Sequence, residues 1–124
     1  YWEDTDAGGI VFYANYLKYF ERARTEWLRA LGVQQRALRE QTGGMFVVVD
    51  ATLKYHRPAR LDDELVVTAR LQDSGRAALT IAQQARLAGS HDLLCEGAIR
   101  IGWVDAASMK PARLPPDIVE KLHS

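Results

Sequence analysis

The stretch from residue 3 to residue 24, EDTDAGGIVFYANYLKYFERAR, contains the residues best suited to chemistry. Its acids precede two glycines and an amphipathic segment, so the carboxylate of Asp6 is expected a few residues before a helix N-terminus. The free N–H groups in the first turn of a helix stabilise developing negative charge, and a nearby carboxylate can act as a base or a nucleophile. An acyl-transfer site needs both parts.

These acids have other interpretations. An Asp beside glycine, like Asp6, is most often a turn or capping carboxylate. Asp4 lies two residues away, on the same face of an extended strand, and we interpret it as a structural or hydrogen-bonding acid. The string DTDAGG also looks like the beginning of a calcium loop, but its fifth position is Gly8 and its twelfth is Asn15, where a bidentate Glu is required. Calcium binding is therefore rejected.

The elements that position these residues follow from the hydrophobic periodicity. We expect the end of a strand at residues 1–4, a turn at Gly8 and Gly9, and a helix over residues 15–31 that Gly32 ends. Four strands should follow, and the short connections between the last three favour antiparallel hairpins. The expected strands span residues 45–55, 64–72, 78–87 and 93–104, with short helices at 34–41 and 117–122.

This order of elements predicts an α+β fold. One apolar-faced helix and a curved five-stranded antiparallel sheet can bury each other, so the long central helix should be wrapped by the sheet. A chain of 124 residues fits a single domain, residues 1–124. Because the chain opens at Tyr1 and not at a methionine, we expect a few N-terminal residues to be missing from it.

Composition excludes several classes of function. Sixteen basic and sixteen acidic side chains cancel, so no nucleic-acid partner is expected. No apolar run is long enough to cross a membrane. Cys95 is the only cysteine, which fits a cytoplasmic protein, and we expect it to be a small buried hydrophobe. His56, His91 and His123 lie far apart in the sequence, so no metal site is expected.

The motifs together resemble those of a known family, the hotdog-fold acyl-CoA thioesterases. The resemblance rests on the opening D-x-D-x-x-G-x-V-x-Y-x-x-Y, on ERAR in the helix, on PARLDD and on the tail MKPARLP. Within the family, the chain is most similar to the bacterial YbgC-type enzymes associated with the Tol-Pal system, and more distantly to the 4-hydroxybenzoyl-CoA thioesterases. The resemblance implies hydrolysis of acyl-CoA or acyl-carrier-protein thioesters to free acid and thiol, without a bound cofactor.

The resemblance also implies roles for individual residues. Asp6 matches the catalytic carboxylate of the family, and Tyr13 matches the residue whose backbone N–H polarises the thioester carbonyl. Asp6 would either attack the carbonyl to give a mixed anhydride or deprotonate an attacking water, and both routes remain open. Gly8 and Gly9 would let the backbone approach the acyl group closely. Arg76 aligns with a region that meets the phosphates of coenzyme A in related thioesterases, although a solvated turn arginine explains it equally well.

The family resemblance further implies a homodimer or homotetramer, with each site formed where the helix of one subunit meets another. It also suggests peripheral association with the inner membrane. Two other functions are kept as alternatives. One is a non-catalytic protein that binds acyl carrier protein or acts as a scaffold at the inner membrane, against which the intact Asp6 argues. The other is a hotdog hydratase or dehydratase, which relies on a His in the helix region, whereas no His lies between Tyr1 and Tyr55.

Overall fold

The computed structural model describes the backbone of residues 5–57 and 63–122, and the side chains of residues 16–57 and 63–122. A long helix, α1 (Thr5–Ala30), is followed by a short one, α2 (Gln35–Thr42). Four strands come next, β1 (Gly44–Tyr55), β2 (Leu65–Ser74), β3 (Ala78–Leu87) and β4 (Leu93–Asp105), and the chain continues into α3 (Pro116–Leu122). The predicted α+β class is confirmed, and the four strands begin and end within two residues of their predicted bounds.

The strands form one antiparallel sheet in the order β1-β4-β3-β2, so β1 and β2 are its edges in the described part of the chain. Both short connections make hairpins, as predicted. The prediction of five strands is wrong for the described residues, which contain four. The fifth strand was assigned to residues 1–4, which lie outside the described residues.

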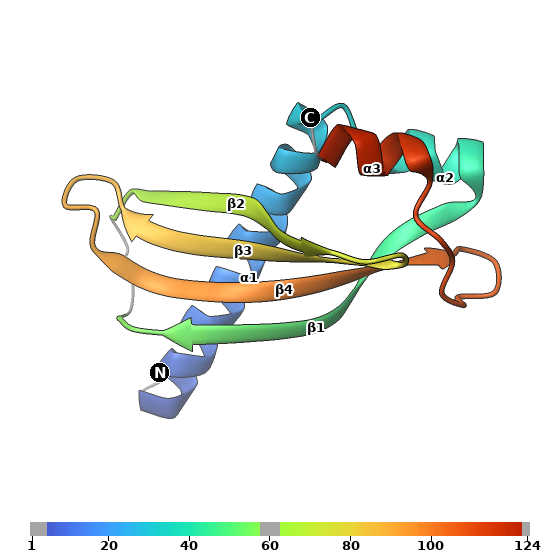
Figure 1. Ribbon diagram of the computed structural model, residues 1–124. Coiled ribbons are helices and arrows are strands. Elements are labelled where there is room, and N and C mark those ends of the chain that lie inside the picture. The colour runs from blue at the N-terminus through green and yellow to red at the C-terminus, as the bar shows by residue number, and fades with distance from the viewer. Residues whose placement is uncertain (1–4, 58–62, 123–124) are drawn as a thin grey trace.

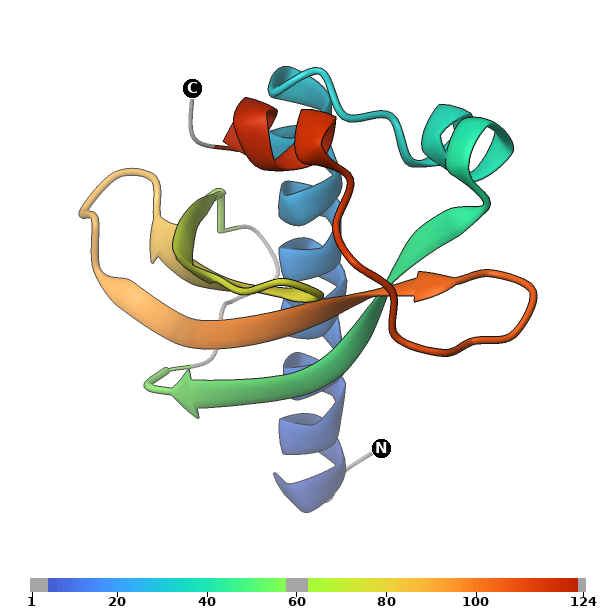
Figure 2. The same cartoon turned by 45° about the vertical axis from the view of Figure 1, so that its right-hand side comes forward.

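Helix α1 crosses one face of the sheet diagonally, and its N-terminal turns extend past β1 (Figures 1 and 2). Side chains alternate along β3 between this face and the outer one, because successive residues of a strand point to opposite sides. Two apolar clusters fill the contact. One joins Leu28 of α1 to the sheet and to α3, and the other joins Tyr16 and Phe20 to Ala85 and Cys95.

The start of α1 differs from the prediction. The helix begins at Thr5, about ten residues earlier than expected, and the predicted turn at Gly8 and Gly9 is wrong because both lie within it. A glycine costs only about 1 kcal/mol relative to alanine inside a helix, and a helix satisfies its own backbone hydrogen bonds where no strand is available to pair with.

The other end of α1 is as predicted. Gly32 adopts a left-handed φ of 86°, and the N–H of Val33 donates to the carbonyl of Leu28 over 2.8 Å, which closes the last turn. The ammonium of Lys121 in α3 donates to the carbonyl of Gly32 over 3.2 Å. The C-terminal end of α1 is therefore tied to α3. No helix in the described part of the chain is both long and apolar enough to cross a membrane.

Candidate active site

The predicted catalytic residues all lie in the N-terminal turns of α1. Asp6 is in the first turn, Gly8 and Gly9 follow, and Tyr13 lies about two turns further on. The side chain of Asp6 lies outside the described residues, so its place is given by the backbone alone. The first four N–H groups of an α-helix have no acceptor within it, which here are those of residues 5–8. Asp6 is thus placed among free backbone donors.

The backbone N–H of Tyr13 is in a different position. In an uninterrupted helix this group donates to the carbonyl of the residue four positions earlier, which is Gly9. In this conformation the free donors of the helix lie beside Asp6 and not at Tyr13. This difference arises from the early start of α1.

The N-terminal half of α1 lies against the end of the sheet that carries the β3–β4 hairpin. The hydroxyl of Tyr16 donates to the carbonyl of Arg57 over 3.1 Å, and the ring of Tyr16 packs edge-on against Tyr55 with centroids 5.6 Å apart. This contact joins α1 to the end of β1. The sheet end with β1 and the β3–β4 hairpin therefore belongs to the surroundings of the predicted site.

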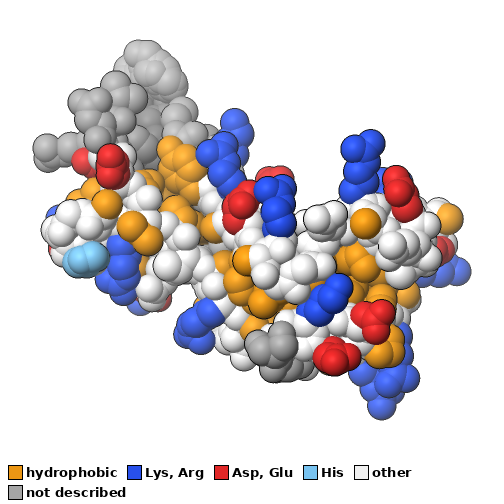
Figure 3. Space-filling view, turned by 90° about the horizontal axis from the view of Figure 1, so that it is seen from above, with side chains coloured by type: hydrophobic (Ala, Val, Ile, Leu, Met, Phe, Trp, Pro, Cys, Tyr) orange, Lys and Arg blue, Asp and Glu red, His pale blue; other side chains and the backbone are white. Residues whose placement is uncertain are grey.

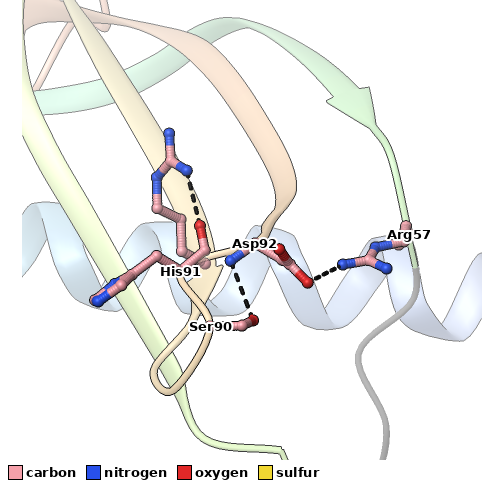
Figure 4. Close-up of polar contacts among 5 residues, drawn as sticks. Arg57, Ser90, His91 and Asp92 are labelled. Atoms are coloured by element: carbon pink, nitrogen blue, oxygen red, sulfur yellow. Dashed lines mark hydrogen bonds and ion pairs between the residues drawn. The ribbon is translucent and has the colours of Figure 1, made fainter.

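A polar cluster occupies this sheet end (Figure 4). Arg57 forms an ion pair with Asp92, and the N–H of Asp92 donates to the hydroxyl of Ser90. The hydrogen bond from Arg57 is the main cause of the lowered pKa of the Asp92 carboxyl. Arg86 donates to the carbonyl of His91, whose backbone has a left-handed φ of 65°. The pair of Arg57 with Asp92 joins the hairpin to the segment after β1, and the other two bonds lie within the hairpin, so the cluster has a structural role.

Arg76 lies far from Asp6 within one protomer. It sits in the turn between β2 and β3, where its carbonyl accepts a hydrogen bond from the N–H of Leu114. Leu114 packs in the same cluster as Leu28, at the C-terminal half of α1. The helix rises 1.5 Å per residue, so Asp6 and Leu28 are roughly 30 Å apart along it. One protomer does not bring Arg76 and Asp6 together.

Clefts flank α1 on both sides. The one between α1 and β2 has a volume of about 740 Å³, and its apolar lining includes Trp27, Leu65 and Val67. The one between α1 and β1 has a volume of about 270 Å³, with Arg24 and Phe46 in its lining. Figure 3, which views the molecule from above, shows hydrophobic side chains exposed between charged ones. The face seen in this view is therefore a mixture of apolar and charged surface.

Cys95 is fully buried, as predicted. Burial, with a smaller effect of the Glu96 carboxylate, raises the pKa of its thiol to about 11, so the reactive thiolate is scarce at neutral pH. His56 pairs with Glu96 over 2.8 Å at the protein surface. Among the residues whose side chains are described, no three or more His, Cys, Asp or Glu are grouped to hold a metal ion.

The sequence-based prediction missed one polar pair in the core, between Arg24 of α1 and Gln83 of β3. The signal was present in the sequence, because Arg24 is four residues from both Phe20 and Leu28 on the apolar face. Ala23, Trp27 and Leu31, which continue the apolar spacing from Phe20 at three- and four-residue steps, are only half-buried.

Comparisons with known proteins identify the family. The model of the thioesterase-like superfamily matches residues 1–122. The acyl-CoA thioesterase YbgC of Haemophilus influenzae is 39% identical over 123 residues, which are 99% of this chain and 89% of that protein.

Two solved structures share the fold. A 1,4-dihydroxy-2-naphthoyl-CoA thioesterase from Synechocystis superposes with a TM-score of 0.83 at 17% identity, covering 91% of this chain and 82% of that one. A thioesterase complexed with coenzyme A and Zn from Thermus thermophilus superposes with a TM-score of 0.72 at 27% identity, over 89% of this chain and 76% of that one. The predicted hotdog fold is thereby confirmed, and the chain belongs to the thioesterase-like superfamily, among its acyl-CoA thioesterases of the YbgC type.

Proposed function

We propose that this protein hydrolyses acyl-CoA or acyl-carrier-protein thioesters to free acid and thiol, with Asp6 as the general base or nucleophile. The observation that carries the proposal is the match to YbgC acyl-CoA thioesterases over nearly the whole chain. The position of Asp6 in the first turn of α1 supports it, because free backbone N–H groups there suit an oxyanion. Coenzyme A enters as part of the substrate, and no further cofactor is invoked.

The thioester carbonyl is polarised in this proposal by the backbone N–H of Tyr13. That role requires the turns before Tyr13 to leave the helical conformation when substrate binds, so that the N–H loses its carbonyl partner. Gly8 and Gly9 favour such opening, since each weakens a helix by about 1 kcal/mol relative to alanine. With the opening placed there, Tyr13 would lie in the first turn of a shorter helix, and its N–H would point at the carbonyl oxygen.

We further propose that the enzyme works as a homodimer or homotetramer. Arg76 is our candidate for contact with the phosphates of coenzyme A, and it lies near the opposite end of α1 from Asp6. If both residues serve one substrate, they must come from different protomers. The single cysteine fits the reducing cytoplasm, where we place the protein, in peripheral contact with the inner membrane.

The test measures thiol release from a panel of acyl-CoA and acyl-carrier-protein thioesters by the parent protein, Asp6→Asn and the matched control Asp4→Asn. We expect turnover of at least one substrate, and a fall in kcat of about 10³-fold or more for Asp6→Asn at unchanged melting temperature. Asp4→Asn should stay within about tenfold of the parent, because its carboxylate is assigned a structural role.

Two outcomes would contradict the proposal. Near-parental kcat for Asp6→Asn would rule out its catalytic role. Absence of turnover on every substrate, together with binding of acyl carrier protein, would favour the non-catalytic alternative.

A further inference from the structure

A polar pair interrupts the apolar contact between α1 and the sheet. On α1, buried residues recur at every fourth position, and Arg24 lies between two apolar ones, Phe20 and Leu28. On β3, buried residues recur at every second position, and Gln83 lies between Ile81 and Ala85. Arg24 is 9% exposed and Gln83 1% exposed. The two polar residues therefore face each other at the boundary between the two apolar clusters.

The hydrogen bonds of Gln83 span one turn of α1. A guanidinium nitrogen of Arg24, Nη1, donates to Oε1 of Gln83 over 2.9 Å. The Nε2 of Gln83 donates to the backbone carbonyl of Phe20, also over 2.9 Å. In a regular helix that carbonyl is also the acceptor for the N–H of Arg24, four residues later. One amide group thus contacts α1 at two points that are one turn apart.

Stability alone does not explain the pair. Burial lowers the pKa of Arg24, an effect that the nearby Glu21 carboxylate partly offsets, yet an arginine stays charged at neutral pH. A buried guanidinium whose hydrogen-bond partner is a neutral amide is costly, and apolar replacements of buried charged groups are often neutral or stabilising. The pair must be explained by something other than the free energy of folding.

The spacing of the buried residues on α1 indicates that the polar pair fixes the axial position, or register, of the helix on the sheet. Tyr16, Phe20 and Leu28 are separated by four or eight residues. An axial shift of α1 by four residues, about 6 Å, would therefore again place apolar residues against apolar ones except at Arg24. Apolar contacts are non-directional and discriminate weakly between such registers. In a shifted register the guanidinium of Arg24 would be buried without Gln83. Only one axial position of α1 satisfies both polar groups.

We propose that Gln83 and Arg24 are positioning residues, which hold α1 at one axial position on the sheet and so place its N-terminal turns in the active site. The inference rests on the proposed function, because it is the backbone N–H of Tyr13 that the helix must carry to the thioester carbonyl. Arg24 and Tyr13 belong to the same helix, 11 residues apart, and Tyr13 stays in it when the turns at Gly8 and Gly9 open, so an axial displacement at Arg24 is passed on to Tyr13. A misplacement of 1 Å in a catalytic group can cost about 10²-fold in rate.

The experiment replaces both polar groups by apolar ones of similar length, in the variant Arg24→Met/Gln83→Met. We expect its melting temperature to equal or exceed that of the parent, its kcat to fall by about tenfold to a hundredfold, and its KM to change less than its kcat. A residue pair with only a structural role would change activity in proportion to the fraction of folded protein. The matched control is Glu26→Ala/Arg29→Ala, which removes an exposed ion pair from the same helix and should leave kcat unchanged.

A conservative variant gives a second measurement. Arg24→Lys keeps a cationic donor for Oε1 of Gln83 and leaves the hydrogen bond from Gln83 to the carbonyl of Phe20 in place, so it should fold and retain kcat within about threefold of the parent. Parental kcat in a folded Arg24→Met/Gln83→Met variant would overturn the proposal. If that double variant does not fold, a loss of more than tenfold in folded Arg24→Lys overturns it instead.

Failure of the proposed function has a different signature. Near-parental activity of Asp6→Asn contradicts the role of Asp6, whereas a loss of kcat in the double Met variant would still support positioning of another group on the same helix segment.

Discussion

The two halves of α1 have opposite surroundings. The C-terminal half packs through Leu28 against the sheet and α3, and it ends in the closed turn at Gly32. The N-terminal half carries Asp6 and Tyr13, and its first turns extend past the edge of the sheet at β1 (Figures 1 and 2), although Tyr16 near the middle of the helix is still buried. One half of the helix is held by its own domain, whereas the first turns of the other half lie beyond the sheet.

The residues that anchor the helix and the residues proposed for catalysis therefore lie in different parts of α1. The residues that anchor α1 are buried among apolar side chains, where truncation removes packing. The proposed catalytic groups lie in turns whose backbone can change conformation without disturbing those clusters. Substitutions in the two halves should therefore affect different measurements, and three predictions test this separation.

The largest effect is expected for Leu28→Ala in the anchored half. Leu28 is 2% exposed and packs in the larger cluster, so its truncation should cost about 2–5 kcal/mol of unfolding free energy. Urea unfolding measures this loss, and the kcat of the protein that remains folded should stay within about twofold of the parent. A strong fall in kcat at unchanged stability would contradict the separation.

A smaller effect is expected for Gly97→Ala, at the point where α1 crosses β4. A Cβ atom there would lie 2.4 Å from Cδ2 of Leu53 and 3.4 Å from the ring of Phe20. Overpacking of this kind typically costs about 1–3 kcal/mol. Because the side chain of Leu53 would have to move and the carbonyl oxygen of Thr52 would lie only 3.1 Å away, thermal unfolding should show the loss of stability, with Gly89→Ala as the control, where no atom lies within 4 Å. Equal melting temperatures for the two variants would contradict the prediction.

The smallest effect is expected for Asp92→Asn, at the sheet end near the N-terminal half. The hydrogen bond from Arg57 lowers the pKa of the Asp92 carboxyl below its usual 3.8, so folding favours the charged form. The stabilisation is present above pH 3.8 and is lost as the pH falls through the lowered value. The parent should melt above the variant at pH 6, and the two should converge near pH 2. Arg57→Gln should show the same convergence, and a difference that persists at pH 2 would contradict this origin.

Much of the fold could be predicted from the sequence. The alternating and β-branched runs located all four strands, and Gly32 marked the end of α1. The beginning of α1 was predicted wrongly, because Gly8 and Gly9 were interpreted as a turn. The propensity of two residues is a weak signal, and here the hydrogen bonding of the whole segment outweighed it.

The candidate site was predictable only in part. The motif around Asp6 identified the family, and the comparisons confirm that identification. The buried partnership of Arg24 with Gln83 was missed, since it joins residues 59 positions apart in the sequence. A polar residue at one position of an apolar stripe shows that a partner is needed, but it does not show which one.

The sequence by itself determined the four strands, the hairpins, the end of α1 and the membership of a thioesterase family, because each depends on residue types at short and regular spacing. Only the tertiary structure decided that α1 extends beyond the sheet, that Arg76 and Asp6 lie toward opposite ends of a protomer, and that Gln83 meets Arg24. These features depend on where distant segments pack against one another. That placement is set by the summed contacts of the whole chain, which no local pattern contains.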